Sequence, residues 1–279
     1  MEKNSPLQLQ PFLKWAGGKR QLLPTIRRYI PRQFSTYYEP FVGAGAVLYA
    51  LHPVKAVIND INTELINCYR VLKEAPEELL QDLAQHKNDV EYYYQIRDQD
   101  RKSSFKHFSA VQRASRIIFL NKTCYNGLFR VNSAGHFNVP FGRYKNPKIL
   151  DEQGLKAVSR YLNENKVEIL NTDFERAVDL GEKGDFVYFD PPYDPISDTS
   201  SFTGYSLNGF GREEQRRLRK VFGELDKKGC YVLLSNSATE FICDLYKDYK
   251  IVTVSANRAI NSKADGRGKI DEVLVMNYD

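Results

Sequence analysis

The chain has 279 residues, of which 42% are hydrophobic and 27% are charged, and its formal net charge is +5. This composition is typical of an ordinary soluble globular protein. No apolar run approaches the roughly 20 residues that span a bilayer, and the first ten residues lack the pattern of a secretory signal. The four cysteines have no CxxC spacing, which favours reduced thiols over a disulfide framework or a metal site. We therefore expect a cytoplasmic protein.

Strand and helix patterns alternate in the first part of the chain. Residues 36–51, TYYEPFVGAGAVLYAL, predict a short strand, a glycine-rich turn and the start of a helix. Residues 55–60, KAVIND, predict a β-branched strand that ends in Asp60. Residues 61–84 predict a helix that is interrupted near Pro76, because proline cannot continue a helix.

The segment between Arg97 and Lys148 is strongly basic. It carries +9 while the rest of the chain sums to −4, because only Asp98 and Asp100 oppose eleven basic residues: Arg97, Arg101, Lys102, Lys106, Arg113, Arg116, Lys122, Arg130, Arg143, Lys145 and Lys148. Such a localised charge favours a polyanionic partner, and a solvated basic helical face is the alternative. The pattern from about residue 90 to 148 begins as a helix and becomes loop-rich, so we expect a separate insert.

The second half returns to alternating strands and helices. Strands are predicted at 166–172, 185–190 and 230–236, and an amphipathic helix with a glycine stop at 211–229. The last run, DEVLVMNYD, is a candidate edge strand. Strands separated by helices predict an α/β fold with a largely parallel sheet.

The glycine-rich turn FVGAG at 41–45 indicates a nucleotide-like ligand. Gly43 and Gly45 permit close backbone approach at the end of a strand, where α/β sheets bind such ligands. Asp60 ends the next strand and can accept hydrogen bonds from ribose hydroxyls. The third glycine of the dinucleotide fingerprint is replaced by Leu48. This favours a nucleoside without phosphates, such as S-adenosylmethionine, and an ordinary tight turn is the alternative.

Two further stretches carry candidate ligand-binding residues. WAGGKR at 15–20 lacks the first glycine and the final Ser or Thr of a phosphate-binding loop, so Lys19 is interpreted as a partner for a carboxylate of the cofactor. In NTDFERA at 171–177, Asp173 is expected to accept from an adenine amino group and Phe174 to stack on the ring. The alternative is that Asp173 caps the following helix.

The stretch YFDPPY at 188–193 predicts the chemistry. Asp190 ends a buried strand, and Pro191 restricts it to extended geometry and offers no N–H donor. The Asp190 carboxylate and the Pro191 carbonyl then form a rigid pair of acceptors beside the ring of Tyr193. Such a pair suits an aromatic amine, whose nitrogen becomes nucleophilic when both N–H groups are bound and the lone pair is freed. A strand-ending turn is the alternative.

Several motifs together resemble the Dam-type DNA adenine-N6 methyltransferases. They are FLKWAGGK (12–19), EPFVGAG (39–45), YNGLFR (125–130), FNVPFGRYKNP (137–147) and YFDPPY, and they occur in that family's order over about residues 12–275. The resemblance implies an α/β fold: a Rossmann-like methyltransferase sheet with helices on both faces plus a mostly helical target-recognition insert. It also implies N6 methylation of adenine in double-stranded GATC, with S-adenosylmethionine as cofactor, S-adenosylhomocysteine as product and no metal.

The resemblance also implies residue roles. The residues expected to contact the cofactor are Trp15, Lys19, Phe41, Gly43, Asp60, Asp173 and Phe174, and those expected to hold the target adenine are Asp190, Pro191, Pro192 and Tyr193. Arg130 and Lys14 are expected to read guanine edges, and Leu128 and Pro140 to contact the thymine methyl. Tyr125, with Asn126 beside it, is expected to fill the stack, and Tyr144 is a further DNA contact. For Leu128, Pro140 and Tyr144, simple packing is the alternative.

Domain boundaries and partners follow from the same comparison. Residues 1–60 and 150–279 are expected to form the cofactor-binding catalytic domain and residues 61–149 the recognition domain. The target base must be flipped out of the duplex. Residues 197–211 are polar and glycine-rich, which favours a lid over that pocket. The basic residues 257–269 are expected on phosphates, and a solvated surface loop is the alternative. A GATC restriction endonuclease is a candidate partner. Methylation of RNA or of a glutamine amide, and a repressor with an inactive site, are the alternatives.

Overall fold

The computed structural model describes residues 9–15, 17–195, 209–257 and 269–279. The chain divides into two compact units. The first comprises Met1–Gly18, Gly43–His52 and Asp60–Asn171, and the second comprises Lys19–Val42, Pro53–Asn59 and Thr172–Asp279. Most of the predicted lid at 197–211, and nearly all of the predicted basic loop at 257–269, lie outside the described residues.

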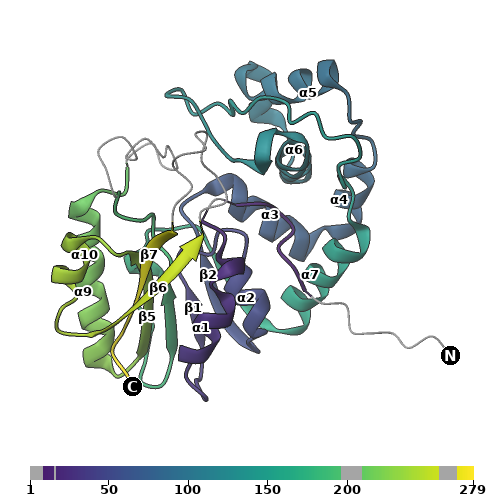
Figure 1. Cartoon of the computed structure of the whole chain (residues 1–279). Coiled ribbons are helices and arrows are strands. Elements are labelled where there is room, and N and C mark those ends of the chain that lie inside the picture. Colours follow the sequence, from purple (N-terminus) through teal and green to yellow (C-terminus); the bar gives the residue numbers. More distant parts are fainter. Residues whose placement is uncertain (1–8, 16, 196–208, 258–268) are drawn as a thin grey trace. The chain divides into compact units, whose positions relative to one another are not determined.

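The second unit is an α/β structure built on a sheet (Figure 1). Its strands follow the order β2-β1-β4-β5-β7-β6. The strands are β1 (Tyr37–Glu39), β2 (Lys55–Asn59), β4 (Phe186–Phe189), β5 (Tyr231–Ser237), β6 (Lys250–Asn257) and β7 (Lys269–Met276), and the helices are η1 (Lys19–Gln21), α1 (Leu23–Tyr29), α8 (Phe174–Ala177), α9 (Arg212–Lys228) and α10 (Glu240–Leu245).

Four neighbouring strands of this sheet are parallel. Tyr38 of β1 lies opposite Val57 of β2 on one side and Val187 of β4 on the other, and β4 continues in parallel register with β5. Every residue of β4 is buried, as expected of a strand covered on both faces. The chain leaves β1 toward β2 on one side and reaches β4 on the other. This reversal is the point at which open α/β sheets bind ligands, outside the carboxyl ends of the strands.

The prediction that the C-terminal run forms an edge strand is wrong. Strand β7 lies between β5 and β6 and pairs antiparallel with both. Val273 to Met276 are all buried, and since successive side chains point to opposite faces of a sheet, both faces are covered at this strand. The edge position belongs to β6, a strand that the sequence patterns did not indicate.

Helices α9 and α10 contribute to the core of the second unit. Leu218, Phe222 and Leu225 of α9 and Ile242 of α10 join a buried cluster with side chains of β4, β5 and β7. Helix α9 ends at Lys228. The next residue, Gly229, has a left-handed φ of 82° and donates its N–H to the carbonyls of Leu225 and Asp226. Glycine adopts this conformation without steric cost, so the predicted glycine stop is confirmed.

The first unit is mainly helical, and α6 lies at its centre, against α3, α4 and α5. Nine residues of α6 are buried, including Arg116 and Asn121. The elements are α2 (Ala46–Leu51), α3 (Thr63–Glu74), α4 (Pro76–Leu83), α5 (Val90–Arg97), η2 (Asp98–Arg101), η3 (Ser103–His107), α6 (Ala110–Thr123), η4 (Tyr125–Gly127), α7 (Glu152–Glu164) and β3 (Lys166–Leu170).

Local sequence explains where these helices begin and end. Pro76 starts α4 directly after α3 ends, which confirms the predicted interruption, because proline fits the first turn of a helix but not its interior. Helix α6 begins with a capping box in which Ser109 and Gln112 bind each other's backbone N–H groups. Its last residues lead directly into η4.

The predicted functional boundaries, 1–60 with 150–279 and 61–149, stay a prediction, because compactness does not show which residues bind a ligand. No helix in the described parts of the chain is long and apolar enough to cross a membrane.

Candidate functional site

In the second unit, a cluster of polar side chains surrounds the residue that follows β4. The Asp190 carboxylate, 18% exposed, lies 2.7 Å from the ammonium of Lys19, which is 6% exposed. The Ser235 hydroxyl of β5 donates to the same oxygen, Oδ1, at 3.0 Å. Ser235 in turn lies 3.0 Å from the hydroxyl of Tyr188. Both contacts of Asp190 fall on Oδ1, so Oδ2 is available as an acceptor among the described residues.

The electrostatics of Asp190 reflect two opposing causes. Burial raises the pKa of the carboxyl group, and the charge of Lys19 with the hydrogen bonds from Lys19 and Ser235 lowers it in part. The net result is a pKa above its ordinary value. A carboxylate of this kind accepts a proton more readily than an exposed aspartate does.

Tyr193 stands beside Asp190 with its ring and hydroxyl both held. The hydroxyl donates to Glu272 of β7 at 2.8 Å, and the Lys19 ammonium lies 4.7 Å from the centre of the ring. Burial and the nearby acidic groups raise the pKa of Tyr193 well above its usual value. Tyr193 therefore stays protonated and presents a neutral aromatic face.

The turn that contains the two prolines is anchored by side chains from α9 and β5. Gln215 donates to the Pro192 carbonyl at 2.8 Å and accepts from Asn236. Asn236 also accepts from the N–H of Asp194. No group among the described residues donates to the Pro191 carbonyl. The predicted acceptor pair, Asp190 and Pro191, is thus followed by a turn held in one conformation.

In the first unit, three of the predicted cofactor residues come together around the glycine turn. The N–H of Gly43 donates to Asp60 at 3.2 Å, and a Cβ on Gly43 would lie 3.0 Å from the indole of Trp15. Tyr69 donates to the Gly43 carbonyl at 3.0 Å, and a Cβ on Gly45 would meet the same hydroxyl at 2.7 Å. Both glycines have left-handed φ angles, so this turn requires residues without side chains.

Asp60 carries an unusual charge environment. It accepts from the N–H groups of Gly43 and Asn62, yet burial raises its pKa to about 6. Desolvation of the charged form outweighs the two hydrogen bonds. The carboxylate is therefore ionised at neutral pH and becomes protonated in mildly acidic solution.

The second unit holds the other predicted cofactor residues. The rings of Phe41 and Phe174 stack with centres 5.4 Å apart. The Asp173 side chain accepts from the N–H of Glu175 and so caps α8, as the alternative reading proposed. It also pairs with Arg217, whose guanidinium lies 4.3 Å from the centre of the Phe174 ring. Lys19 contacts Asp190 and Tyr193, and its expected contact with the cofactor stays a prediction.

The predicted DNA contacts all belong to the first unit, where a buried asparagine of α6 anchors two of their segments. Asn121 accepts from the N–H of Lys14 at 2.9 Å and donates to the carbonyls of Lys14 and Gly127. A Cβ on Gly127 would come within 2.4 Å of the Lys14 side chain, so the chain needs glycine there. The Lys14 ammonium lies 5.1 Å from the centre of the Tyr144 ring.

We name residues 125–144 the recognition segment. It begins with Tyr125, an aromatic residue that is 54% exposed, and Asn126, which is exposed and has a left-handed φ of 55°. The N–H of Tyr125 donates to the carbonyl of Pro140, which is itself exposed, whereas Leu128 is half-buried. An exposed tyrosine on a tight turn is available to insert into another molecule.

Arg130 lies exposed in the same segment, held by one neighbour. Its guanidinium donates to the side chain of Asn138 at 2.7 Å and to the Asn138 carbonyl at 3.2 Å. The N–H of Asn138 donates back to the carbonyl of Arg130. Asn138 therefore fixes both the backbone and the side chain of Arg130.

The basic charge of this region is partly neutralised within the protein. Five of the eleven basic residues pair with carboxylates: Arg97, Arg101, Arg113, Arg116 and Lys148. Arg116 is buried, which corrects the interpretation of this residue as part of a docking surface. Exposed basic residues without an ion pair among the described residues include Lys102, Lys106, Arg130, Arg143 and Lys145.

Sequence reasoning missed the residues that support the site. Ser235, Glu272, Asn121 and Asn138 each hold a predicted functional residue through a hydrogen bond. For Ser235 a signal existed, since a polar pair, Ser-Asn, ends the apolar run CYVLLSN at the carboxyl end of a strand. The other three carry no local pattern. No group of three or more metal-binding side chains occurs in the part of the chain that is described.

Comparison with known proteins identifies the class of enzyme. The family model described as D12 class N6 adenine-specific DNA methyltransferase matches residues 15–260. The chain belongs to this family. It is therefore an enzyme that methylates N6 of adenine in DNA at a specific site. Membership favours DNA over RNA or a glutamine amide as the substrate. The α/β fold agrees with the predicted fold class.

Full-length relatives give the same result. The chain is 50% identical over 280 residues to the Type II methyltransferase M1.LlaDCHI of Lactococcus lactis subsp. cremoris. The match covers 100% of this chain and 98% of that protein. It is 45% identical to the Type II methyltransferase M.MjaIII of Methanocaldococcus jannaschii, covering 98% and 100%. It is 35% identical to the DNA adenine methylase of Escherichia coli K12, covering 99% and 96%.

Proposed function

We propose that this enzyme transfers a methyl group from S-adenosylmethionine to N6 of adenine in double-stranded GATC, after the adenine has been flipped out of the helix. The observation that carries the proposal is the acceptor pair after β4. Asp190 offers Oδ2 and Pro191 offers its carbonyl, both without a donor among the described residues, beside the held ring of Tyr193.

These residues act on the amine of the target base. N6 donates one hydrogen to Asp190 and one to the Pro191 carbonyl, which draws the nitrogen away from planarity and frees its lone pair for attack. The bond from N6 to the methyl carbon would form as the bond from that carbon to the sulfonium sulfur of S-adenosylmethionine breaks, and S-adenosylhomocysteine would leave. One N6 proton would pass to Asp190, whose raised pKa suits it as the acceptor. Tyr193 stacks on the base and offsets part of the cost of unstacking, a few kcal/mol.

The residues around the glycine turn fit the cofactor. The turn lacks Cβ atoms at Gly43 and Gly45, where added side chains would collide with their neighbours, and Asp60 offers a carboxylate to ribose hydroxyls. We assign Trp15, Gly43 and Asp60 to this role, with Phe41, Asp173 and Phe174 on the adenine ring. S-adenosylmethionine supplies an electrophilic methyl group when bound. Lys19 is assigned to the cofactor as well, and its charge helps to keep Asp190 ionised.

The recognition segment reads the sequence. Arg130 is exposed, and Asn138 holds its guanidinium group through two hydrogen bonds. A guanidinium oriented in this way suits bidentate contact with guanine. Lys14 is the second guanine reader, Leu128 and Pro140 contact the thymine methyl, and Tyr144 is a further DNA contact. Tyr125, exposed on its turn beside Asn126, fills the space that the flipped adenine leaves.

The test is methylation of defined duplexes with labelled cofactor. The purified protein is incubated with a duplex that contains one GATC site and with duplexes that carry each single-base change, and N6-methyladenine is measured by mass spectrometry. Incorporation confined to the adenine of GATC is expected. Equal incorporation into duplexes without GATC would refute the sequence assignment, and incorporation only into single strands would refute base flipping from the duplex.

We also propose that a restriction endonuclease specific for GATC acts on the same sites in the cytoplasm. The support is that two of the similar proteins are named Type II methyltransferases. The test is deletion of the methyltransferase gene in its own host. Loss of viability with DNA cut at GATC is expected, and normal growth with intact DNA would contradict the proposal.

A further inference from the structure

The recognition segment is weakly held by its own backbone. Its two arms are joined by one isolated bridge, Val131 with Phe137, and by a few backbone hydrogen bonds, among them the one from the Asn138 N–H to the Arg130 carbonyl. A second bridge, Cys124 with Phe141, lies at its start, and a short two-stranded ribbon is marginal in water. A local slip of one residue at the Val131–Phe137 bridge would place a residue other than Asn138 beside Arg130. The position of Arg130 therefore depends on Asn138 within the ribbon and on whatever holds Asn138 from outside it.

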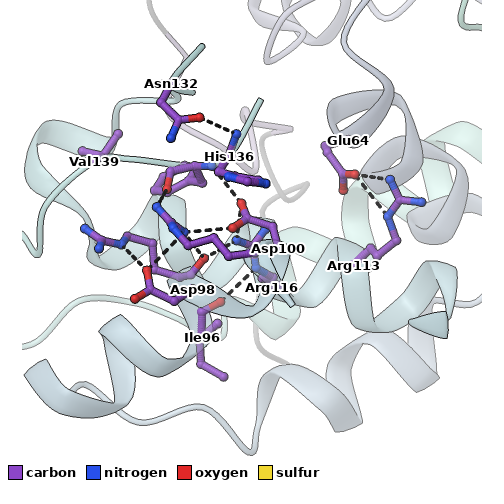
Figure 2. Close-up of polar contacts among 12 residues, drawn as sticks. Glu64, Ile96, Asp98, Asp100, Arg113, Arg116, Asn132, His136 and Val139 are labelled. Carbon is purple, nitrogen blue, oxygen red and sulfur yellow. Dashed lines mark hydrogen bonds and ion pairs between the residues drawn. The ribbon is translucent and has the colours of Figure 1, made fainter. Parts of the chain in front are cut away.

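A buried ion pair in the first unit supplies this anchor (Figure 2). Arg116 of α6 is 3% exposed, and its guanidinium lies 2.8 Å from Asp100 of η2. The same guanidinium donates to the carbonyls of Ile96 and Arg97, at 2.9 Å and 2.6 Å. Arg116 thus fixes the end of α5 and the start of η2 against α6.

Asp100 passes this constraint to the recognition segment. One of its oxygens, the one that Arg116 binds, accepts from the N–H of Phe137 at 2.8 Å. Arg101, which binds the other oxygen at 2.9 Å, donates to the Phe137 carbonyl at 3.0 Å. Both backbone groups of Phe137 are therefore bound by η2, and the next residue, Asn138, holds Arg130.

Stability alone does not explain a buried pair of this kind. Removing two charges from water is costly, and apolar side chains of similar size often serve stability as well or better. The best-attested use of buried ionic groups is to select one register among several. Here the register decides which residue lies beside Arg130.

We propose that Arg116 and Asp100 are positioning residues for sequence recognition, which act on guanine readout through Phe137, Asn138 and Arg130. The proposal rests on the proposed function, because it takes Arg130 as the guanine reader. Neither Arg116 nor Asp100 needs to contact DNA. Their effect is confined to the base that Arg130 reads.

The test measures discrimination, the ratio of kcat/KM on GATC to kcat/KM on a duplex with the guanine replaced. Arg116→Met keeps most of the side-chain volume and leaves Asp100 paired with Arg101. We expect it to lower discrimination at guanine by about tenfold, the order of one good base contact, and to leave the ratios at the other positions unchanged. The matched control is Arg113→Met, on the same helix as Arg116, which removes the ion pair with Glu64 of α3. It should leave every ratio within about twofold of wild type.

A double variant separates positioning from independent effects. If Arg116 acts through Arg130, Arg116→Met/Arg130→Ala should discriminate no worse than Arg130→Ala alone. If the losses of guanine discrimination in the two single variants multiply in the double variant, the proposal is overturned. It is also overturned if Arg116→Met lowers the melting temperature but leaves discrimination unchanged, or if it lowers discrimination equally at all base positions. Should Arg116→Met not fold, Arg101→Met and Asn138→Ala interrupt the same path at less buried residues, and unchanged guanine discrimination in both would overturn it equally.

The wild-type protein distinguishes the two proposals. A wild-type enzyme without preference for GATC refutes the proposed function. A wild-type enzyme that prefers GATC, with an Arg116→Met variant that keeps the same preference, refutes only the positioning role.

Discussion

The residue that would receive the target amine and the residue that would read its neighbour are held in opposite ways. Asp190 is largely buried, and charged and polar side chains, Lys19 and Ser235, bind it directly. Arg130 is exposed, and one neutral side chain, Asn138, holds it. A carboxylate that must bind an amine and take its proton gains from low dielectric, whereas a reader of base edges must reach into a groove. Chemistry and recognition therefore place different demands on burial.

The largest effect on turnover is expected from substitution of the buried residue, Asp190. Asp190→Ala removes one of the two acceptors and should lower kcat by about 10³-fold or more, the range of a lost preorganised catalytic group. Duplex affinity should change little, because phosphate contacts supply most of it. Single-turnover kinetics and a binding assay check both. Asp190→Asn is the matched control, since it keeps the shape and loses the charge, and near-normal turnover in both variants would contradict the acceptor-pair mechanism.

For the exposed residue, Arg130, the expected loss is smaller and is confined to discrimination at one base. Arg130→Ala should cost about 1–3 kcal/mol of discrimination at guanine, seen in kcat/KM on duplexes with that base changed. Lys145→Ala, an exposed cation of the same part of the chain, should weaken binding to all sequences alike. If Arg130→Ala also weakened all sequences alike, Arg130 would be a phosphate contact.

A pH effect is expected from Asp60, whose pKa is raised to about 6. If only the carboxylate binds ribose, cofactor affinity should fall about tenfold for each pH unit below 6. Titration calorimetry between pH 5 and 8 checks this, and Asp60→Asn should bind weakly with no such dependence. An affinity that stays constant down to pH 5 in the wild type would exclude Asp60 from the site.

The same raised pKa affects stability with a fixed sign. The folded protein holds the Asp60 proton more tightly than the unfolded chain, so the stabilisation is complete below about pH 4 and is lost as pH rises through about 6. Its size is at most about 3 kcal/mol. The difference in unfolding free energy between wild type and Asp60→Asn should therefore shift in favour of the variant as pH rises from 4 to 7.

The smallest change is expected at Tyr193. Tyr193→Phe keeps the aromatic face and loses the hydrogen bond to Glu272, which is worth about 0.5–1.5 kcal/mol, so kcat should fall by no more than about tenfold. Tyr278→Phe is the control, because the Tyr278 hydroxyl donates to the carbonyl of Tyr29. Equal rates for wild type and Tyr193→Phe would show that Glu272 does not position the ring.

The sequence was sufficient for features that depend on local pattern. The alternating strands and helices, the interruption at Pro76, the stop at Gly229 and the acidic residue at the end of β4 follow from periodicity and turn chemistry. The place of β7 inside the sheet did not follow, because strand order depends on pairing between distant segments. The burial of Arg116 was equally hidden, since a buried arginine and a DNA-facing arginine look alike in sequence and only the partner, Asp100, distinguishes them.

Asn121 has a practical consequence for engineering. Through one amide side chain it joins two stretches that are more than a hundred positions apart in the chain, at Lys14 and at Gly127. A chimaera that takes residues 125–144 from a relative with another target sequence would combine the relative's segment with the original residues around Lys14, which Asn121 joins to it. Transplants should therefore move both stretches and Asn121 as one cassette.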